Sequence, residues 1–429
     1  MSELLDYAIE MHTHGRLDEA EAVYQQLLSI TPDEHTALHF LGILLHQRDR
    51  SDAALAMIIR SIELSPPQPA WYNDLGNVLM ERGEFAAAAG IFSQSLTLEP
   101  SDANVWNNLG AALQRCERLD EACAAFETSI ALNPEVSHAL NNLAALLSAQ
   151  GKDNEAAEYY CRAFVLEPHD GKAKNMLGIA YYKLGRIADA AEIYRQWLFE
   201  APGNATALHL YAACSGVNVP ARASDDYIEE TFDDYAKNFD DKLVGDLSYK
   251  GPDIITQALA RFRVPEQRLD ILDGGCGTGL CGPRIAPYAR QLVGVDLSSK
   301  MLEIARQCGV YNALHKAELT RFLLDHPAAF DVIVIADTLI YFGSLDEVFT
   351  VSANALRPGG LLIFTHEQAS DITAHGNYQI NPNGRHSHDT DYVRASLKSA
   401  GFDVQTMDAV EIRKEFTVPV AGWVTTAVK

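Results

Sequence analysis

The chain has 429 residues, a length that predicts two or three domains, each large enough to bury a core. Its formal net charge of −24 argues against a surface built mainly to attract nucleic acid or an anionic membrane. No apolar run reaches the roughly 18–20 residues of a membrane span, and no basic segment followed by an apolar one opens the chain. The seven cysteines lack CxxC or metal-type spacing, so we expect a cytoplasmic protein with reduced thiols and no bound metal.

The sequence repeats every 34 residues from its start to Asn204. Alanine recurs at Ala20, Ala54, Ala88, Ala122, Ala156 and Ala190, and proline at Pro32, Pro66, Pro100, Pro134, Pro168 and Pro202. A small residue recurs at Ala8, Gly42, Gly76, Gly110, Ala144 and Gly178, and a large one at Tyr24, Ile58, Phe92, Phe126, Tyr160 and Tyr194. Each unit is predicted to be two amphipathic helices that cross closely at the small residue, and the proline ends the second helix.

This pattern resembles the tetratricopeptide repeat (TPR) family over about half of the chain. The resemblance implies an all-α solenoid of six repeats. Residues 205–214 continue one more apolar helix pattern, which predicts a helix that caps the last repeat. We therefore expect a repeat domain over residues 1–214, a linker over 215–225 and a second domain over 226–429.

Polar residues at one position of the repeats are candidate contacts for a partner. Equivalent positions of successive first helices lie on one face, so Asp74, Asn108 and Asn142 can line a concave groove. Their side chains suit an extended peptide backbone. The expected partner is a protein or peptide, with self-association as the alternative use of the array. These amides can also bridge neighbouring helices without touching any ligand.

From residue 226 onward, helical segments alternate with short β-branched runs. A helical lead-in reaches about residue 263, and the runs follow at residues 269–272, 291–295, 332–335 and 361–365. This alternation predicts a doubly wound α/β domain whose parallel sheet is covered on both faces.

A glycine-rich loop and three acidic residues point to the ligand of this domain. The loop Asp273-Gly-Gly-Cys-Gly-Thr-Gly279 follows the first strand, Asp296 ends the second, and Glu318 follows the next segment. Asp296 is placed to bind two ribose hydroxyls, and Glu318 to accept a hydrogen bond from an adenine amino group. Three acids without a phosphate-binding base describe a cationic nucleoside without phosphates, which is S-adenosylmethionine. The alternatives are another nucleotide-binding fold and, for Glu318, a solvated loop acid.

Residues from about 227 to 429 resemble class I S-adenosylmethionine-dependent methyltransferases, which have a Rossmann-like fold and release S-adenosylhomocysteine. The resemblance also covers Ala317-Glu318-Leu319, Phe330-Asp331-Val332-Ile333 and Leu356-Arg-Pro-Gly-Gly-Leu361. It implies a lid over the cofactor at residues 232–240. The cofactor residues that it implies are Tyr235, Asp273, Gly275, Gly277, Gly279, Asp296, Leu297, Glu318, Leu319, Ala336 and Asp337. Gly274 departs from the family, where a larger apolar residue is usual, and Tyr235 has a core role as its alternative.

The acceptor side is expected near the end of the fifth strand. His366 and His388 are the candidate general bases, because a histidine pKa of about 6.5 suits proton transfer at neutral pH. Tyr341 and Arg385 are the candidate acceptor contacts, since an arginine fork can hold a carboxylate or phosphate. The alternatives are structural histidines, or a metal cluster of His366, Glu367, His388 and Asp389.

Three readings of function follow. The first is a methyltransferase whose repeats recruit a protein- or peptide-linked acceptor. The second is a small-molecule methyltransferase whose repeats serve oligomerisation. The third is a TPR adaptor with a vestigial methyltransferase domain, against which the complete set of acidic residues argues.

Overall fold

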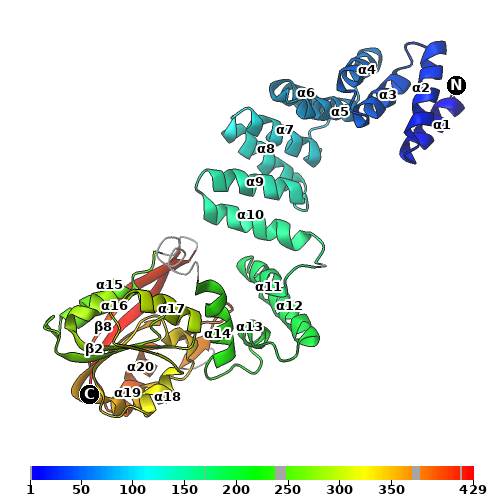
Figure 1. Ribbon diagram of the computed structural model, residues 1–429. Coiled ribbons are helices and arrows are strands. Elements are labelled where there is room, and N and C mark those ends of the chain that lie inside the picture. Colours follow the sequence, from blue (N-terminus) through cyan, green and yellow to red (C-terminus); the bar gives the residue numbers. More distant parts are fainter. Residues whose placement is uncertain (1, 170, 237–247, 370–376, 416–417) are drawn as a thin grey trace. The chain divides into compact units, whose positions relative to one another are not determined.

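The computed structural model describes residues 2–169, 171–236, 248–369, 377–415 and 418–429 (Figure 1). By its internal contacts the chain forms two compact units, Met1–Asp170 and Gly171–Lys429. A helical repeat array precedes an α/β sheet, which confirms the predicted fold class. In the part of the chain that the structure describes, no helix is both long and apolar enough to cross a membrane.

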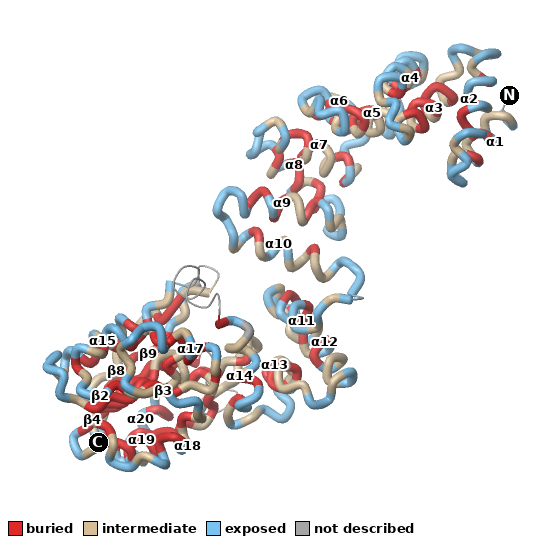
Figure 2. The backbone as a smooth tube through the Cα atoms, viewed as in Figure 1, coloured by how far each residue is buried: buried red, intermediate tan, exposed pale blue. Residues whose placement is uncertain are grey.

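The first unit consists of paired helices. Their bounds are α1 Ser2–Thr13, α2 Leu17–Ile30, α3 His35–Gln47, α4 Ser51–Leu64, α5 Pro69–Glu81, α6 Phe85–Leu98, α7 Ala103–Arg115, α8 Leu119–Leu132, α9 Ser137–Ala149 and α10 Asp153–Leu166. Buried residues face the neighbouring helices, and exposed ones lie on the outer surfaces (Figure 2). The unit therefore has an extended core that runs from pair to pair.

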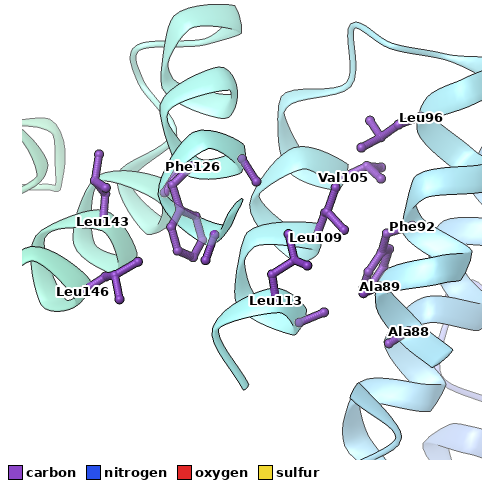
Figure 3. Packing of buried hydrophobic residues seen from close by; sticks show 14 of the residues in the cluster. Ala88, Ala89, Phe92, Leu96, Val105, Leu109, Leu113, Phe126, Leu143 and Leu146 are labelled. Carbon is purple, nitrogen blue, oxygen red and sulfur yellow. The ribbon is translucent and has the colours of Figure 1, made fainter. Parts of the chain in front are cut away.

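Close helix crossings explain the ladder of small and large residues. A Cβ added to Gly76 would lie 2.4 Å from the ring of Phe92, and one added to Gly110 would lie 2.6 Å from the ring of Phe126. Both rings are fully buried (Figure 3). The prediction that the small residue admits the second helix is thus confirmed. The fifth repeat departs from the pattern, because Tyr160 is 43% exposed.

The second unit contains the sixth repeat and the sheet domain. Its helices include α11 Lys174–Lys183, α12 Ile187–Glu200, α13 Ala205–Ser215, α14 Asp225–Tyr235, α15 Gly251–Ala260, α16 Gly282–Ile285, α17 Ser299–Gln307, α18 Leu319–Leu324, α19 Asp346–Ala355 and α20 Thr390–Ser399. Its strands are β1 Leu269–Gly274, β2 Ala289–Asp296, β3 Ala313–Lys316, β4 Phe330–Ile335, β5 Leu356–Glu367, β6 Tyr378–Ile380, β7 His386–His388, β8 Asp403–Glu415 and β9 Val418–Val428.

The main sheet has the order β3-β2-β1-β4-β5-β9-β8. Strands β1 to β5 pair in parallel, with Ile271 opposite Val332 and Leu272 opposite Ile333. Strand β9 pairs antiparallel with both β5 and β8, so the predicted parallel sheet has an antiparallel edge. Strands β8 and β9 follow each other closely in the sequence, which is possible only for antiparallel neighbours.

Helices cover both faces of the sheet. Leu272 and Ile333 pack with residues of α18, α19 and α20, whereas Ile271 and Val332 pack with residues of α15 and α16. This alternation follows from the two-residue period of a strand, and it makes the central strands apolar on both faces.

The sixth repeat and α13 belong to the second compact unit, which begins at Gly171. The predicted domain boundary, by contrast, follows residue 214. The contacts of α13 give the reason. His209 on α13 stacks on Tyr227 of α14 at 4.0 Å between ring centroids. The predicted linker is also bound to the sheet domain, because the Ala223 amide donates to the Tyr341 carbonyl at 2.9 Å.

Candidate functional site

A cavity opens at the carboxyl ends of β1, β2 and β4, the edge of the sheet where ligands bind in doubly wound folds. Its lining comprises Arg222, Ile228, Phe232, Tyr249, Asp273, Gly275, Cys276, Gly277, Leu280, Cys281, Val295, Asp296, Leu297, Met301, Ala317, Glu318, Leu319, Ala336, Asp337, Thr338, Tyr341, Phe342 and Arg385. The cavity therefore brings together most of the predicted cofactor residues and both predicted acceptor contacts.

The three predicted loop glycines have different roles. Gly275, Gly277 and Gly279 all have positive φ, at +72°, +54° and +88°. A Cβ on Gly275 would collide with Thr338 at 2.1 Å, and one on Gly279 would press on Tyr311 at 3.1 Å. A Cβ on Gly277 meets no protein atom within 4 Å. Gly275 and Gly279 thus serve the packing of the loop, whereas Gly277 leaves open space in which a ligand can approach the backbone.

Two carboxylates line the cavity, Asp273 fully buried and Asp296 half-buried. Asp273 accepts a hydrogen bond from the Tyr311 hydroxyl at 2.7 Å, and burial raises the pKa of Asp273 to about 7. Asp296 accepts from the Gly277 amide and the Ser298 amide, each at 2.9 Å. Burial also raises the pKa of Asp296, against these amide bonds. A cationic ligand or a pair of hydroxyl donors would stabilise the ionised form of both groups.

Glu318 lines the cavity and also caps a helix. Its carboxylate accepts from the Thr320 amide at 3.0 Å and the Arg321 amide at 2.8 Å, at the start of α18. The Thr320 hydroxyl also donates to Oε2, and Nη1 of Arg222 lies 3.9 Å from Oε1. These contacts fix the side chain, and of its roughly four acceptor positions about one, on Oε1, remains for a further donor. The predicted residues Leu297, Leu319 and Ala336 also line the cavity, where they supply apolar surface.

The charges of the lining suit a cationic nucleoside without phosphates. Both arginines of the described lining are already paired, Arg222 with Asp225 at 2.7 Å and Arg385 with Glu415. Among the described residues, the acids Asp273 and Asp296, by contrast, form no ion pair. Together with the open space over Gly277, these carboxylate acceptors fit S-adenosylmethionine.

Of the predicted lid, residues 232–240, Phe232 lines the cavity. The predicted residue Tyr235, three positions further along α14, is 45% exposed and does not line the cavity. The ring of Phe232 meets that of Tyr341 edge-on at 5.6 Å. Residues 237–240 of the predicted lid lie outside the described part of the chain.

The predicted bases His366 and His388 do not line the cavity. Both are fully buried, and their ring centroids lie 6.3 Å apart. Burial lowers the pKa of His366 to about 3 and that of His388 to about 4. Nε2 of His388 donates to the carbonyls of Phe342 and Gly343, at 2.8 and 3.0 Å. The expectation that one of them faces the transferred methyl is corrected, because β5 and β7 carry both side chains into the core.

The alternative metal cluster does not assemble either. Glu367 is paired with Arg413, and Asp389 caps α20 by accepting from the Asp391 and Tyr392 amides. Among the described residues, no three or more His, Cys, Asp or Glu side chains gather as a metal site.

An ion network lies beside the cavity and includes residues that the sequence did not reveal. Arg413, on β8, is fully buried and donates to Asp337, Glu367 and Glu415. Glu415 also pairs with the cavity residue Arg385. Arg413 and Glu415 were missed because they come from the last hairpin, where no motif marks a charged residue as buried. An arginine and a glutamate two residues apart share one face of a strand, which is the only signal available.

The predicted groove residues bridge neighbouring first helices. The side chain of Asn108 donates to Asn73 at 3.0 Å, and that of Asn142 donates to Asn107 at 2.9 Å. His39 and Asp74 form the equivalent bridge at 3.0 Å. Such bridging is the predicted alternative to a ligand contact. Asp74, Asn108 and Asn142 lie between helices, and each side chain is still partly exposed.

Two family models match the chain. Residues 272–364 match a family described as "Methyltransferase domain", and residues 7–213 match the "Cilia and flagella-associated protein 70 C-terminal domain", a TPR family. The chain is similar to the ubiquinone biosynthesis O-methyltransferase of Colwellia psychrerythraea, with 26% identity over 30% of this chain and 56% of that protein. The same enzyme of Chelativorans sp. is 32% identical over 24% of this chain and 42% of that protein. The chain thus spans about half the length of these relatives.

Solved structures resemble each part of the chain. MamA 41-end from Desulfovibrio magneticus RS-1 is 19% identical and covers 40% of this chain and 97% of its own, with a TM-score of 0.38. An S-adenosylmethionine dependent methyltransferase from Mesorhizobium loti is 22% identical and covers 42% of this chain and 100% of its own, with a TM-score of 0.34.

Proposed function

We propose that this protein transfers the methyl group of S-adenosylmethionine to a protein- or peptide-linked acceptor, and that the repeat array recruits this acceptor. The chain carries a TPR-like array followed by a methyltransferase domain, which supports the proposal. The observation that carries the cofactor assignment is Asp296, a half-buried carboxylate at the end of β2 that is held by the Gly277 and Ser298 amides. In this position it can accept from the two ribose hydroxyls of a nucleoside.

The residues around the cavity have separable tasks in this proposal. Gly277 gives the ligand access to the backbone, and Glu318 receives the adenine amino group. When bound, S-adenosylmethionine supplies an electrophilic methyl on a sulfonium. The chain contributes by holding donor and acceptor in line and by excluding water.

The wall beside the ion network is the proposed acceptor side. Phe232, Tyr341 and Phe342 provide an aromatic surface, and Arg385 provides a polar one. An aromatic wall keeps the transfer site dry, and the paired Arg385 can still donate from its remaining N–H groups. The described lining contains no histidine, so the proposal assigns no base to His366 or His388.

A small-molecule acceptor is the second candidate, and one observation favours it. The curated relatives are named as enzymes of ubiquinone biosynthesis, although the matched segments cover only part of each. In that case the array would serve self-association. We also propose a cytoplasmic location, which the lack of CxxC or metal-type spacing among the seven cysteines supports.

The two candidates are separated by a labelled-methyl assay. The full chain is incubated with methyl-labelled S-adenosylmethionine and a cell lysate that has been fractionated by size. Label in macromolecules supports the first candidate, and label in small solutes supports the second. Absence of label from every fraction, with cofactor binding intact, would favour the adaptor reading.

A further inference from the structure

The turn that presents Arg385 to the cavity is held from the end of the repeat array. This turn joins β6 to β7 and is closed by two backbone bonds, from the Gly384 amide to the Asn381 carbonyl at 2.8 Å and from the Asn381 amide to the Arg385 carbonyl at 2.7 Å. Gly384 has a φ of +83°, a conformation that strongly favours glycine. The geometry of the turn therefore decides where the next side chain, Arg385, points.

Helix α13 contributes the outside contact of this turn. Nε2 of His209 lies 2.7 Å from the Gly384 carbonyl oxygen, so the ring donates this hydrogen bond. His209 is 4% exposed and stacks on Tyr227 at 4.0 Å and 22°. A Cβ on Gly384 would lie 3.1 Å from both the His209 ring and the Tyr227 hydroxyl, so the contact is tight.

A second contact from α13 reaches the same turn, because the Cys214 thiol lies 3.5 Å from the Pro382 carbonyl. On α11, burial chiefly raises the pKa of the Tyr182 phenol, and the charges of Glu415 and Arg385 also act on it. The capping helix thus contacts the turn that carries Arg385 within one compact unit.

We propose that His209 is a positioning residue of the acceptor side, which sets the Arg385 guanidinium through the Gly384 carbonyl. The inference rests on the proposed function only in calling this wall the acceptor side. It makes the last helix of the array a part of the methyltransferase site, so that the end of the array and the orientation of Arg385 are physically coupled.

The test uses the full chain and p-hydroxyphenylglyoxal, which modifies accessible arginines. The rate at which Arg385 is modified is followed by mass spectrometry in the wild type, in His209→Ala and in His209→Gln. The glutamine amide can replace the Nε2–H donor. A matched control is His39→Ala in the other compact unit. His39 is also buried and stacked on an aromatic ring, that of Trp71, and its hydrogen bond goes to the Asp74 side chain.

We expect His209→Ala to raise the modification rate of Arg385 by about 2- to 10-fold, the change in an equilibrium that the loss of one neutral hydrogen bond produces. His209→Gln and His39→Ala should react like the wild type. The proposal is overturned if His209→Ala leaves the rate unchanged, if the glutamine fails to restore it, or if His39→Ala raises it equally. Calorimetry with S-adenosylmethionine on the same samples tests the proposed function separately. If the wild type does not bind the cofactor, the proposed function is contradicted, but the modification rates of Arg385 still test the role of His209.

Discussion

Nη1 of Arg413 donates to both carboxylate oxygens of Asp337, at 2.8 and 3.0 Å, and so ties strand β8 to the cavity residue that follows β4. Asp337 has a φ of +52°, which is uncommon for a residue other than glycine. The ion pair therefore holds the edge of the cavity in a conformation that the local sequence would not favour by itself.

Replacement of Arg413 by methionine should strongly destabilise the second unit. The change leaves the carboxylates of Asp337 and Glu367 without their buried cation, which costs about 3–5 kcal/mol when one partner of a buried pair is removed. Urea unfolding measures the loss. Arg261→Met is the control, because Arg261 forms an exposed pair with Asp408 of the same strand and should cost less than about 1 kcal/mol. Equal losses in the two variants would contradict a special role for Arg413.

Gly110→Ala should destabilise the repeat array. The new methyl group would lie 2.6 Å from the Phe126 ring, and overpacking of this kind costs about 1–3 kcal/mol. Gly90→Ala is the matched control on an exposed helix surface, where the new methyl meets no atom within 4 Å. There, alanine should be neutral or stabilising by up to about 1 kcal/mol. Thermal unfolding of the full chain compares the two, and a stabilising Gly110→Ala would refute the close crossing.

The buried histidines predict a loss of stability in acid. The unfolded-state pKa of a histidine is about 6.5, whereas burial lowers the folded-state pKa of His366 to about 3. The folded state therefore binds fewer protons, so stability is complete above pH 6.5 and falls as the pH drops towards 3. Each such histidine lowers the free energy of unfolding by about 2 kcal/mol at pH 5.

His366→Leu should weaken this acid dependence and leave the affinity for S-adenosylmethionine unchanged, since His366 does not line the cavity. Urea midpoints at pH 5 and pH 7.5 provide the measurement, with the exposed His138 replaced by leucine as control. A large fall in cofactor affinity in His366→Leu would indicate that His366 contributes to the cofactor site.

Binding of S-adenosylmethionine should release a proton near pH 6.5. Asp273 has a pKa of about 7 in the unliganded cavity, so it is largely protonated there, and a cationic ligand lowers that pKa. Affinity should accordingly rise with pH up to about 7. Calorimetry in two buffers of different ionisation enthalpy counts the protons released. Asp273→Asn should abolish the release, and an unchanged count in that variant would assign the proton elsewhere.

A fragment of residues 171–429 should fold, whereas one of residues 226–429 should be less stable. The shorter fragment lacks His209 and Cys214 of α13 and the hydrogen bond from the Ala223 amide to the Tyr341 carbonyl. Circular dichroism and unfolding in urea compare the two. Equal stability would show that the sheet domain is independent of the sixth repeat.

Features with a period or a local motif could be predicted from the sequence. The 34-residue ladder and the glycine loop with Asp296 identified the array, the first strands and the cavity. Contacts between distant segments could not be predicted. His366 follows the predicted strand like a site residue, but β5 continues to Glu367, and its pairing with β9 buries His366. Arg413 enters the network only because the last hairpin folds back along the sheet.

The contacts across the predicted linker could not be predicted for the same reason. Ser215 to Pro220 has the composition of a linker, yet the Gly343 amide donates to the Ala221 carbonyl at 2.8 Å just beyond it. Composition reports the local backbone preference, whereas His209 reaches Gly384 across 175 positions of the sequence.

The central claim is that the cavity binds S-adenosylmethionine through Asp296, and calorimetry of the full chain with Asp296→Ala tests it most directly. The substitution removes a charged acceptor of two hydroxyl bonds, each worth about 1.5–3 kcal/mol, so affinity should fall by at least about 100-fold. The exposed Asp325→Ala on the same unit is the control and should bind like the wild type. Unchanged affinity in Asp296→Ala, or no binding to the wild type, would contradict the account.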